Sequence, residues 1–107
     1  MLVLAVEGLP PEPLAASADF HARVLPQALG AQADVLLAFA PADYTHRAWR
    51  LAAVQGLARV AVPYRVNAVA SDDPAAIAAA QAFLAQAAGV TGQLLPLDSQ
   101  GAGAVVN

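Results

Sequence analysis

The residues best suited to chemistry lie together in one short segment near the middle of the chain. Within residues 43–50 stand a carboxylate, a phenol, an imidazole and two guanidinium groups, supplied by Asp43, Tyr44, His46, Arg47 and Arg50. The segment follows an apolar stretch, residues 33–40, so we expect it to begin a helix just beyond the carboxyl end of a buried strand. Open α/β sheets bind ligands at that edge, and the free N–H groups of a helix start attract anions. The segment therefore predicts a site for a small anion.

Side chains from two segments are expected to meet at this rim. His46 and Arg50 are four positions apart and share a helical face. A second carboxylate, Asp72, follows another apolar stretch and is expected to approach from the same rim. The candidate ligand-binding residues are thus Tyr44, His46, Arg47, Arg50 and Asp72. A structural interpretation of the segment stays open: Asp43 caps the helix and pairs with Arg47, Trp49 is a core or interface residue, and the histidine is solvated.

Other chemistries have no motif in the chain. His21 has no second ligand at metal spacing, and the absence of cysteine excludes a thiolate metal site and a disulfide. Ser17, Ser71 and Ser99 are not set in a nucleophile elbow with a histidine. The glycines of residues 101–103 lack the strand-turn-helix context of a dinucleotide site. We predict no catalytic residue, no metal and no cofactor.

Composition indicates a single domain, residues 1–107, with a sparsely charged surface. Charged residues make up 12% and apolar residues 59%, against a usual charged share of about 25%. The net charge is −3, and all five basic residues are arginine, so nucleic-acid binding is not expected. The apolar run at residues 1–6 is too short for a signal sequence or a membrane span, and we expect a cytoplasmic protein. Such a surface favours association with a partner.

Apolar stretches alternate with helical patterns along the chain. Buried strands are expected at residues 1–6, 33–40, 64–70 and 92–97, with helices at residues 17–30, 44–60 and 74–88. The order β-α-β-α-β-α-β predicts an α/β fold with a parallel four-stranded sheet and right-handed crossovers, followed by a weakly specified tail at residues 101–107. Three helices have two sheet faces to cover, so we expect some sheet surface or edge to need a partner.

Helix boundaries follow from capping residues. Ser17 is expected to cap the first helix, which Pro26 is expected to kink. Asp43 is expected to cap the second helix. The segment at residues 71–74, which reads Ser-Asp-Asp-Pro, is expected to start the third.

Four phrases in the later part of the chain carry a resemblance to a known family. They are AAVQGLAR at residues 52–59, YRVNAVA at 64–70, FLA at 83–85 and VTGQ at 90–93. In this order and spacing they resemble the active-site helix, the next strand, and the closing helix and strand of the short-chain dehydrogenase/reductase family. The resemblance implies a truncated Rossmann-like half-domain in which Asn67 bonds to backbone.

The catalytic residues of that family are replaced here. The register of the resemblance places Arg47 at the position of the family's catalytic tyrosine and Leu51 at that of its lysine. Phe39 and Ala40 end the strand where the family presents its serine. Neither replacement in the tyrosine-lysine pair can carry out hydride-transfer chemistry, so we expect a non-catalytic domain.

The resemblance also implies an interface. In the family the helices corresponding to those near Phe20 and Trp49 pack across the main subunit contact, which makes Phe20, Val24, Trp49 and Val54 candidate interface residues. We expect a homodimer or higher homo-oligomer. Two alternatives remain: an accessory subunit of a full-length homologous NAD(P)-dependent dehydrogenase, and a module that binds a small anion or a nucleotide.

Overall fold

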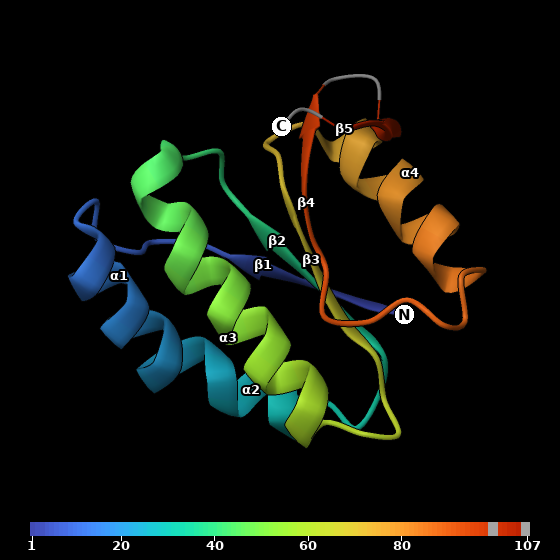
Figure 1. Ribbon diagram of the computed structural model, residues 1–107, viewed down its shortest axis with the longest axis horizontal. Coiled ribbons are helices and arrows are strands. Elements are labelled where there is room, and N and C mark those ends of the chain that lie inside the picture. Colours follow the sequence, from blue (N-terminus) through green and yellow to red (C-terminus); the bar gives the residue numbers. More distant parts are fainter. Residues whose placement is uncertain (99–100, 106–107) are drawn as a thin grey trace.

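The computed structural model describes residues 1–98 and 101–105, which form a sheet with helices on both faces (Figure 1). The first four strands lie side by side and are parallel: β1 (Leu2–Val6), β2 (Val35–Phe39), β3 (Val66–Ala70) and β4 (Leu94–Asp98). The helical segments are α1 (Pro13–Asp19), η1 (Phe20–Val24), α2 (Leu25–Gly30), η2 (Tyr44–His46), α3 (Arg47–Val60) and α4 (Pro74–Ala85). The predicted alternation of four parallel strands with helices is confirmed.

The expected tail contains a fifth strand. Residues Gly101–Val105 form β5, which pairs antiparallel with β4 and extends the order to β1-β2-β3-β4-β5. The prediction missed it because a glycine- and alanine-rich stretch has little strand propensity of its own, and pairing with β4 supplies the missing preference. Residues 106–107 of that tail lie outside the described residues, and so does Ser99.

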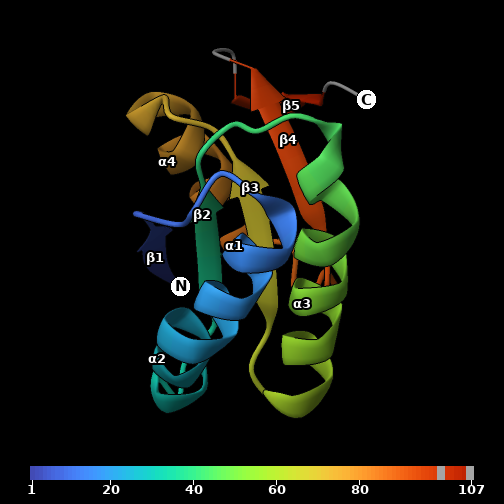
Figure 2. The ribbon, with the colours of Figure 1, turned by 90° about the vertical axis from the view of Figure 1, so that its left-hand side faces the viewer.

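Side chains of the parallel strands alternate between two apolar cores. On one face Val35, Leu37 and Phe39 of β2 pack under η1, α2 and α3. On the other face Leu36 and Ala38 pack under α4. Every residue of β2 is buried, as expected for a central strand covered on both faces. Figure 2 shows α1, α2 and α3 in front of the sheet and α4 behind it.

The third crossover has the opposite hand to the first two. From β1 to β4 the chain always steps in the same direction across the sheet. The first two connections pass over one face, and α4 passes over the other, so the β3-α4-β4 connection is left-handed (Figure 2). Our expectation of right-handed crossovers throughout was therefore wrong for this unit. The helices of the first two connections, α3 included, already cover one face, and the apolar side chains of the other face are buried only if α4 lies there.

The first helix begins earlier than expected and contains a wide turn. Glu12, not Ser17, is its N-cap, and its carboxylate accepts hydrogen bonds from the backbone N–H groups of Leu14 (3.1 Å) and Ala15 (2.7 Å). At η1 the helix widens to a π turn, in which the N–H of Leu25 donates to the carbonyl of Phe20, five residues back. Pro26, at the start of α2, cannot donate a backbone hydrogen bond, and the wide turn lies immediately before it.

The other two predicted helix starts are confirmed. Asp43 caps η2 by accepting a hydrogen bond from the backbone N–H of Thr45 (2.9 Å). Asp73 caps α4 by accepting from the N–H of Ala75 (3.0 Å), and Pro74 follows it as expected.

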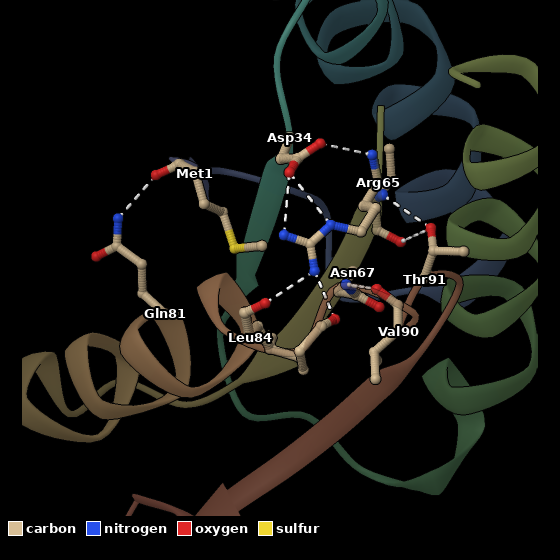
Figure 3. Close-up of polar contacts among 10 residues, drawn as sticks. Met1, Asp34, Arg65, Asn67, Gln81, Leu84, Val90 and Thr91 are labelled. Carbon is tan, nitrogen blue, oxygen red and sulfur yellow. Dashed lines mark hydrogen bonds and ion pairs between the residues drawn. The ribbon is translucent and has the colours of Figure 1, made fainter. Parts of the chain in front are cut away.

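One arginine ties three elements together at the amino end of the sheet (Figure 3). Arg65 donates from its backbone N–H to Oδ1 of Asp34 (2.8 Å), and from Nε (3.2 Å) and Nη2 (3.0 Å) to Oδ2. Its Nη1 donates to the carbonyls of Leu84 (2.9 Å) and Ala87 (2.6 Å) at the end of α4. The guanidinium thereby joins the start of β2, the start of β3 and the last turn of α4.

Buried polar groups close the same end of the sheet. Asn67 is fully buried, and its Nδ2 donates to the carbonyl of Val90 (2.9 Å; Figure 3). Its Oδ1 accepts a hydrogen bond from the N–H of Gln93 (3.1 Å). The expectation that Asn67 bonds to backbone is confirmed. Gln81 of α4 donates to the carbonyl of Met1 (2.8 Å), which attaches the helix to the amino end of β1.

The Asp34–Arg65 contact predicts a specific acid sensitivity. The Arg65 backbone N–H, followed by its guanidinium, lowers the pKa of Asp34. This contribution to stability is therefore complete above the unfolded-state value of about 3.9 and is lost as pH falls through the lower folded-state pKa. Asp34→Asn should lower the free energy of unfolding by about 1–2 kcal/mol at pH 7. The difference from wild type should shrink in denaturant titrations repeated toward pH 3.

Asp19→Asn is the matched control, because Asp19 forms the other ion pair found in the described residues, with Arg23 on an exposed helix surface. Its effect at pH 7 should be much smaller than that of Asp34→Asn. If the two variants lost the same free energy of unfolding at pH 7, the role assigned to Arg65 would be contradicted.

Candidate functional site

A buried arginine lies at the carboxyl edge of the sheet. Arg50 lies on α3 and is only 8% exposed. Its Nη1 donates to the carbonyl of Ala40, just after β2 (2.9 Å). Its Nε is buried without a hydrogen-bond partner. Among the side chains that the structure describes, those of residues 1–97, no hydrogen bond from Nη2 and no carboxylate within ion-pair distance of the guanidinium is found. The guanidinium therefore keeps unused donors.

Aromatic rings hold this guanidinium in place. The Cζ atom of Arg50 lies 4.5 Å from the centre of the Phe39 ring and 5.9 Å from that of Trp49. Phe20 packs against both rings, with centroid distances of 5.6 Å. Such cation–π contacts contribute about 0.5–2 kcal/mol, yet burial still lowers the pKa of Arg50. The rings fix the position of the charge without neutralising it.

His46 connects two parts of the rim, and both of its ring nitrogens have partners within the protein. Its Nδ1 accepts a hydrogen bond from the indole Nε1–H of Trp49 (2.9 Å), and its Nε2 lies 2.9 Å from the carbonyl of Pro11. An indole N–H only donates and a carbonyl only accepts, so the imidazole proton must lie on Nε2. His46 is 7% exposed, so the interpretation of a solvated histidine was wrong.

Arg50 separates two cavities at this rim. The first, which we call the β1 cavity, has a volume of about 330 Å³ and is lined by Glu7, Pro11, Ala40 and His46 besides Arg50. The second, the α3 cavity, measures about 220 Å³. Its polar lining comes from Asp43, Tyr44, His46, Arg47 and Arg50, and its apolar lining includes Ala70, Leu94 and Pro96.

Four of the five predicted ligand-binding residues meet in one place, and the fifth does not. Tyr44, His46, Arg47 and Arg50 all line the α3 cavity. Tyr44 is 87% exposed and Arg47 is also exposed, so these two form its outer rim. Asp72 instead lines a separate cavity with Glu7 and Ser71, and our expectation that it approaches this site was wrong. The reason is that Asp72 leads into α4, which lies on the opposite face of the sheet.

Sequence reasoning missed the residues that form the walls. Leu94 and Pro96 reach the cavity because β4 pairs with β3, with Ala68 opposite Leu94 and Ala70 opposite Pro96. No local signal marks them, since they read only as residues of a buried strand. The role of Phe39 was predictable from the sequence, because an aromatic residue at the end of a strand, followed by a helix start with two arginines, favours a cation–π contact.

The predicted interface residues are mostly internal. Phe20, Val24 and Val54 are at most 4% exposed and belong to the core between helices and sheet, so they cannot form a surface contact. Their apolar character reflects packing within the chain. Trp49 is partly buried and lines a groove of about 440 Å³ between α2 and α3, which we call the helix groove. Its apolar lining also includes Leu25, Leu29, Leu57 and Val60.

The two positions that the resemblance equates with the family's catalytic pair lie in the first two turns of α3. Arg47 is exposed at the rim of the α3 cavity, and Leu51 is half-buried one turn later. No group of three metal-ligating side chains stands together in the described part of the chain. None of its described helices is long and apolar enough to cross a membrane.

A family comparison agrees with the fold. The model of a family described as short chain dehydrogenase-like protein matches residues 4–97. The match covers nearly all of the described chain, from β1 into β4. The chain therefore belongs to the short-chain dehydrogenase-like family. Searches of curated proteins and of solved structures returned no match.

The hydrogen bond between Trp49 and His46 has a direct spectroscopic test. Trp49 is the only tryptophan, so its indole N–H gives one resolved proton–nitrogen signal. In His46→Ala this signal should move and exchange with solvent faster, because the indole loses its acceptor. The measurement is NMR hydrogen exchange.

The control is His21→Ala, which removes the other histidine. The His21 ring lines the helix groove with Trp49 but bonds to the carbonyl of Ser17, not to the indole, so the indole should keep its hydrogen bond and its slow exchange. An unchanged rate in His46→Ala would contradict the hydrogen bond.

Proposed function

We propose that this chain is a non-catalytic short-chain-dehydrogenase-like domain that binds a small anion at the carboxyl edge of its sheet. The observation that carries the proposal is Arg50, a buried guanidinium with no carboxylate partner among the described residues and with unused donors. Buried charges in proteins are normally paired, because an unpaired one is costly. A bound anion would supply the missing partner.

The residues around Arg50 support this interpretation. Phe39 and Trp49 hold the guanidinium between two cavities, and Ala40 takes only one of its donors. Arg47 adds a second positive charge at the rim. Because the charge is held in place before binding, little side-chain entropy would be lost on binding an anion.

The non-catalytic part of the proposal rests on residue types. The resemblance places an arginine at the family's tyrosine position and a leucine at its lysine position, and neither can exchange the proton that hydride transfer requires. His46 offers no substitute, since both its ring nitrogens are bonded within the protein.

Arg50→Met separates a binding role from a structural one. If the guanidinium serves a ligand, the variant should lose the rise in Tm that carboxylate, phosphate or sulfate salts give the wild type at matched ionic strength. Its Tm without those anions should equal or exceed that of the wild type, because methionine can fill the site without an unpaired charge. The measurement is thermal unfolding of both proteins across the salts, with chloride as reference.

Arg59→Met is the control, since Arg59 is exposed near the other end of the same helix. It should keep the anion-dependent rise in Tm. If no salt raises the wild-type Tm, or if Arg59→Met loses the rise as Arg50→Met does, the anion proposal is overturned. A large fall in the Tm of Arg50→Met without anions would assign Arg50 a structural role.

A second candidate function, self-association, is favoured by the helix groove. Its apolar side chains come from both α2 and α3, and two of them, Leu29 (40% exposed) and Val60 (70% exposed), face solvent in the single chain. The low share of charged residues points the same way. We propose a homodimer in which this groove receives the same helices of a second copy.

Leu29→Asp combined with Val60→Glu should convert the dimer to a monomer, because two carboxylates would be buried at the contact. The measurement is solution mass by light scattering over a dilution series. Leu14→Glu is the control: Leu14 is 78% exposed on α1 and does not line the groove. A wild-type protein with the mass of one chain would overturn the homodimer and direct attention to a full-length homologous dehydrogenase as partner.

A further inference from the structure

The second guanidinium decides which of the two cavities beside Arg50 suits an anion. Besides Arg50, the α3 cavity is lined by Arg47 and Asp43, whereas the β1 cavity is lined by Glu7. The charged side chains around the α3 cavity therefore sum to one positive charge, and those around the β1 cavity sum to zero, so an anion is attracted more strongly to the α3 cavity. The ligand is therefore expected in the α3 cavity. This inference rests on the proposed anion-binding function.

The helix start beside the α3 cavity is already occupied by a side chain of the protein. Oδ1 of Asp43 accepts hydrogen bonds from the backbone N–H (2.9 Å) and the hydroxyl of Thr45, and the Asp43 carbonyl accepts from the N–H of His46 (3.2 Å). Phosphate sites at helix starts depend on free N–H groups of this kind. A doubly charged phosphate would lack these donors and would also face the Asp43 carboxylate.

The remaining walls are apolar and the space is small. Ala70, Leu94 and Pro96 line the side formed by the ends of β3 and β4. A volume of about 220 Å³ lies below the range of about 300–1,000 Å³ that ligand pockets usually have, so a nucleotide does not fit. A guanidinium matches the planar, singly charged carboxylate group well, because two of its N–H groups can face two oxygens.

We propose that the α3 cavity binds a short-chain aliphatic monocarboxylate. The carboxylate bonds to the free donors of Arg50, with Arg47 adding charge at the rim. The aliphatic part of the ligand lies against Leu94 and Pro96. The cavity therefore recognises a ligand with a single negative charge and an apolar body, and it discriminates against dianions.

The experiment is an NMR titration of the labelled protein with acetate, propionate, butyrate, butyramide, phosphate and sulfate. Affinity should rise about two- to fourfold for each added methylene from acetate to butyrate, as expected for progressive burial of apolar surface. Butyramide, which has the same shape without the charge, should not bind measurably. Arg50→Met should lower the affinity for butyrate at least tenfold, and Arg47→Gln should lower it a few-fold. Arg59→Met should leave the affinity unchanged.

The possible results separate the two proposals. If phosphate or sulfate binds better than butyrate and Arg50→Met abolishes that binding, the anion site stands and the monocarboxylate is overturned. If carboxylates bind equally well to Arg50→Met, the assignment to this cavity is overturned. If none of the anions perturbs the wild-type spectrum, the proposed anion-binding function itself is overturned.

Discussion

The position of α4 depends on the guanidinium of Arg65. This helix covers the second face of the sheet with small side chains, and Ala76, Ala80 and Leu84 are its buried residues. Alanine buries little apolar area, so packing alone holds such a helix weakly. Arg65 adds charge-assisted hydrogen bonds to the carbonyls at the end of α4 while Asp34 fixes its other donors. These hydrogen bonds hold α4 over the face of the sheet that the left-handed crossover covers.

Two arginines in this chain have opposite surroundings. The donors of Arg65 are matched by the Asp34 carboxylate and two helix carbonyls, whereas those of Arg50 meet one carbonyl and the faces of aromatic rings. The first arrangement is complete without any ligand. The second leaves a positive charge in a place that water reaches poorly, which is a costly state in a folded protein. The amino end of the sheet is therefore complete by itself, whereas the carboxyl end holds the charge on which the anion-binding proposal rests.

Hydrophobic patterning predicted β1 to β4, α3 and α4, and capping residues predicted the helix starts at Asp43 and Asp73, because these features follow from local sequence. It failed where long-range packing decides. Because α4 packs on the opposite face of the sheet, Asp72 lies away from the site. Phe20 and Val54 lie in the core between the helices and the sheet, not at the surface. The grouping of Tyr44, His46, Arg47 and Arg50 was predictable from one helix start. The burial of Arg50 and the walls from β4 needed the strand register, which no local pattern contains.

The π turn in the first helix changes how that helix should be aligned. Ala16, Phe20, Val24 and Ala28 are all buried, and they repeat strictly every four residues. In a regular α-helix such a row drifts by about 40° per step, because four residues exceed one turn of 3.6. A π turn rotates each residue by less and offsets part of the drift, so the row keeps facing the sheet. A related helix without this turn would be one residue shorter, and matching the two correctly requires a gap inside a helix.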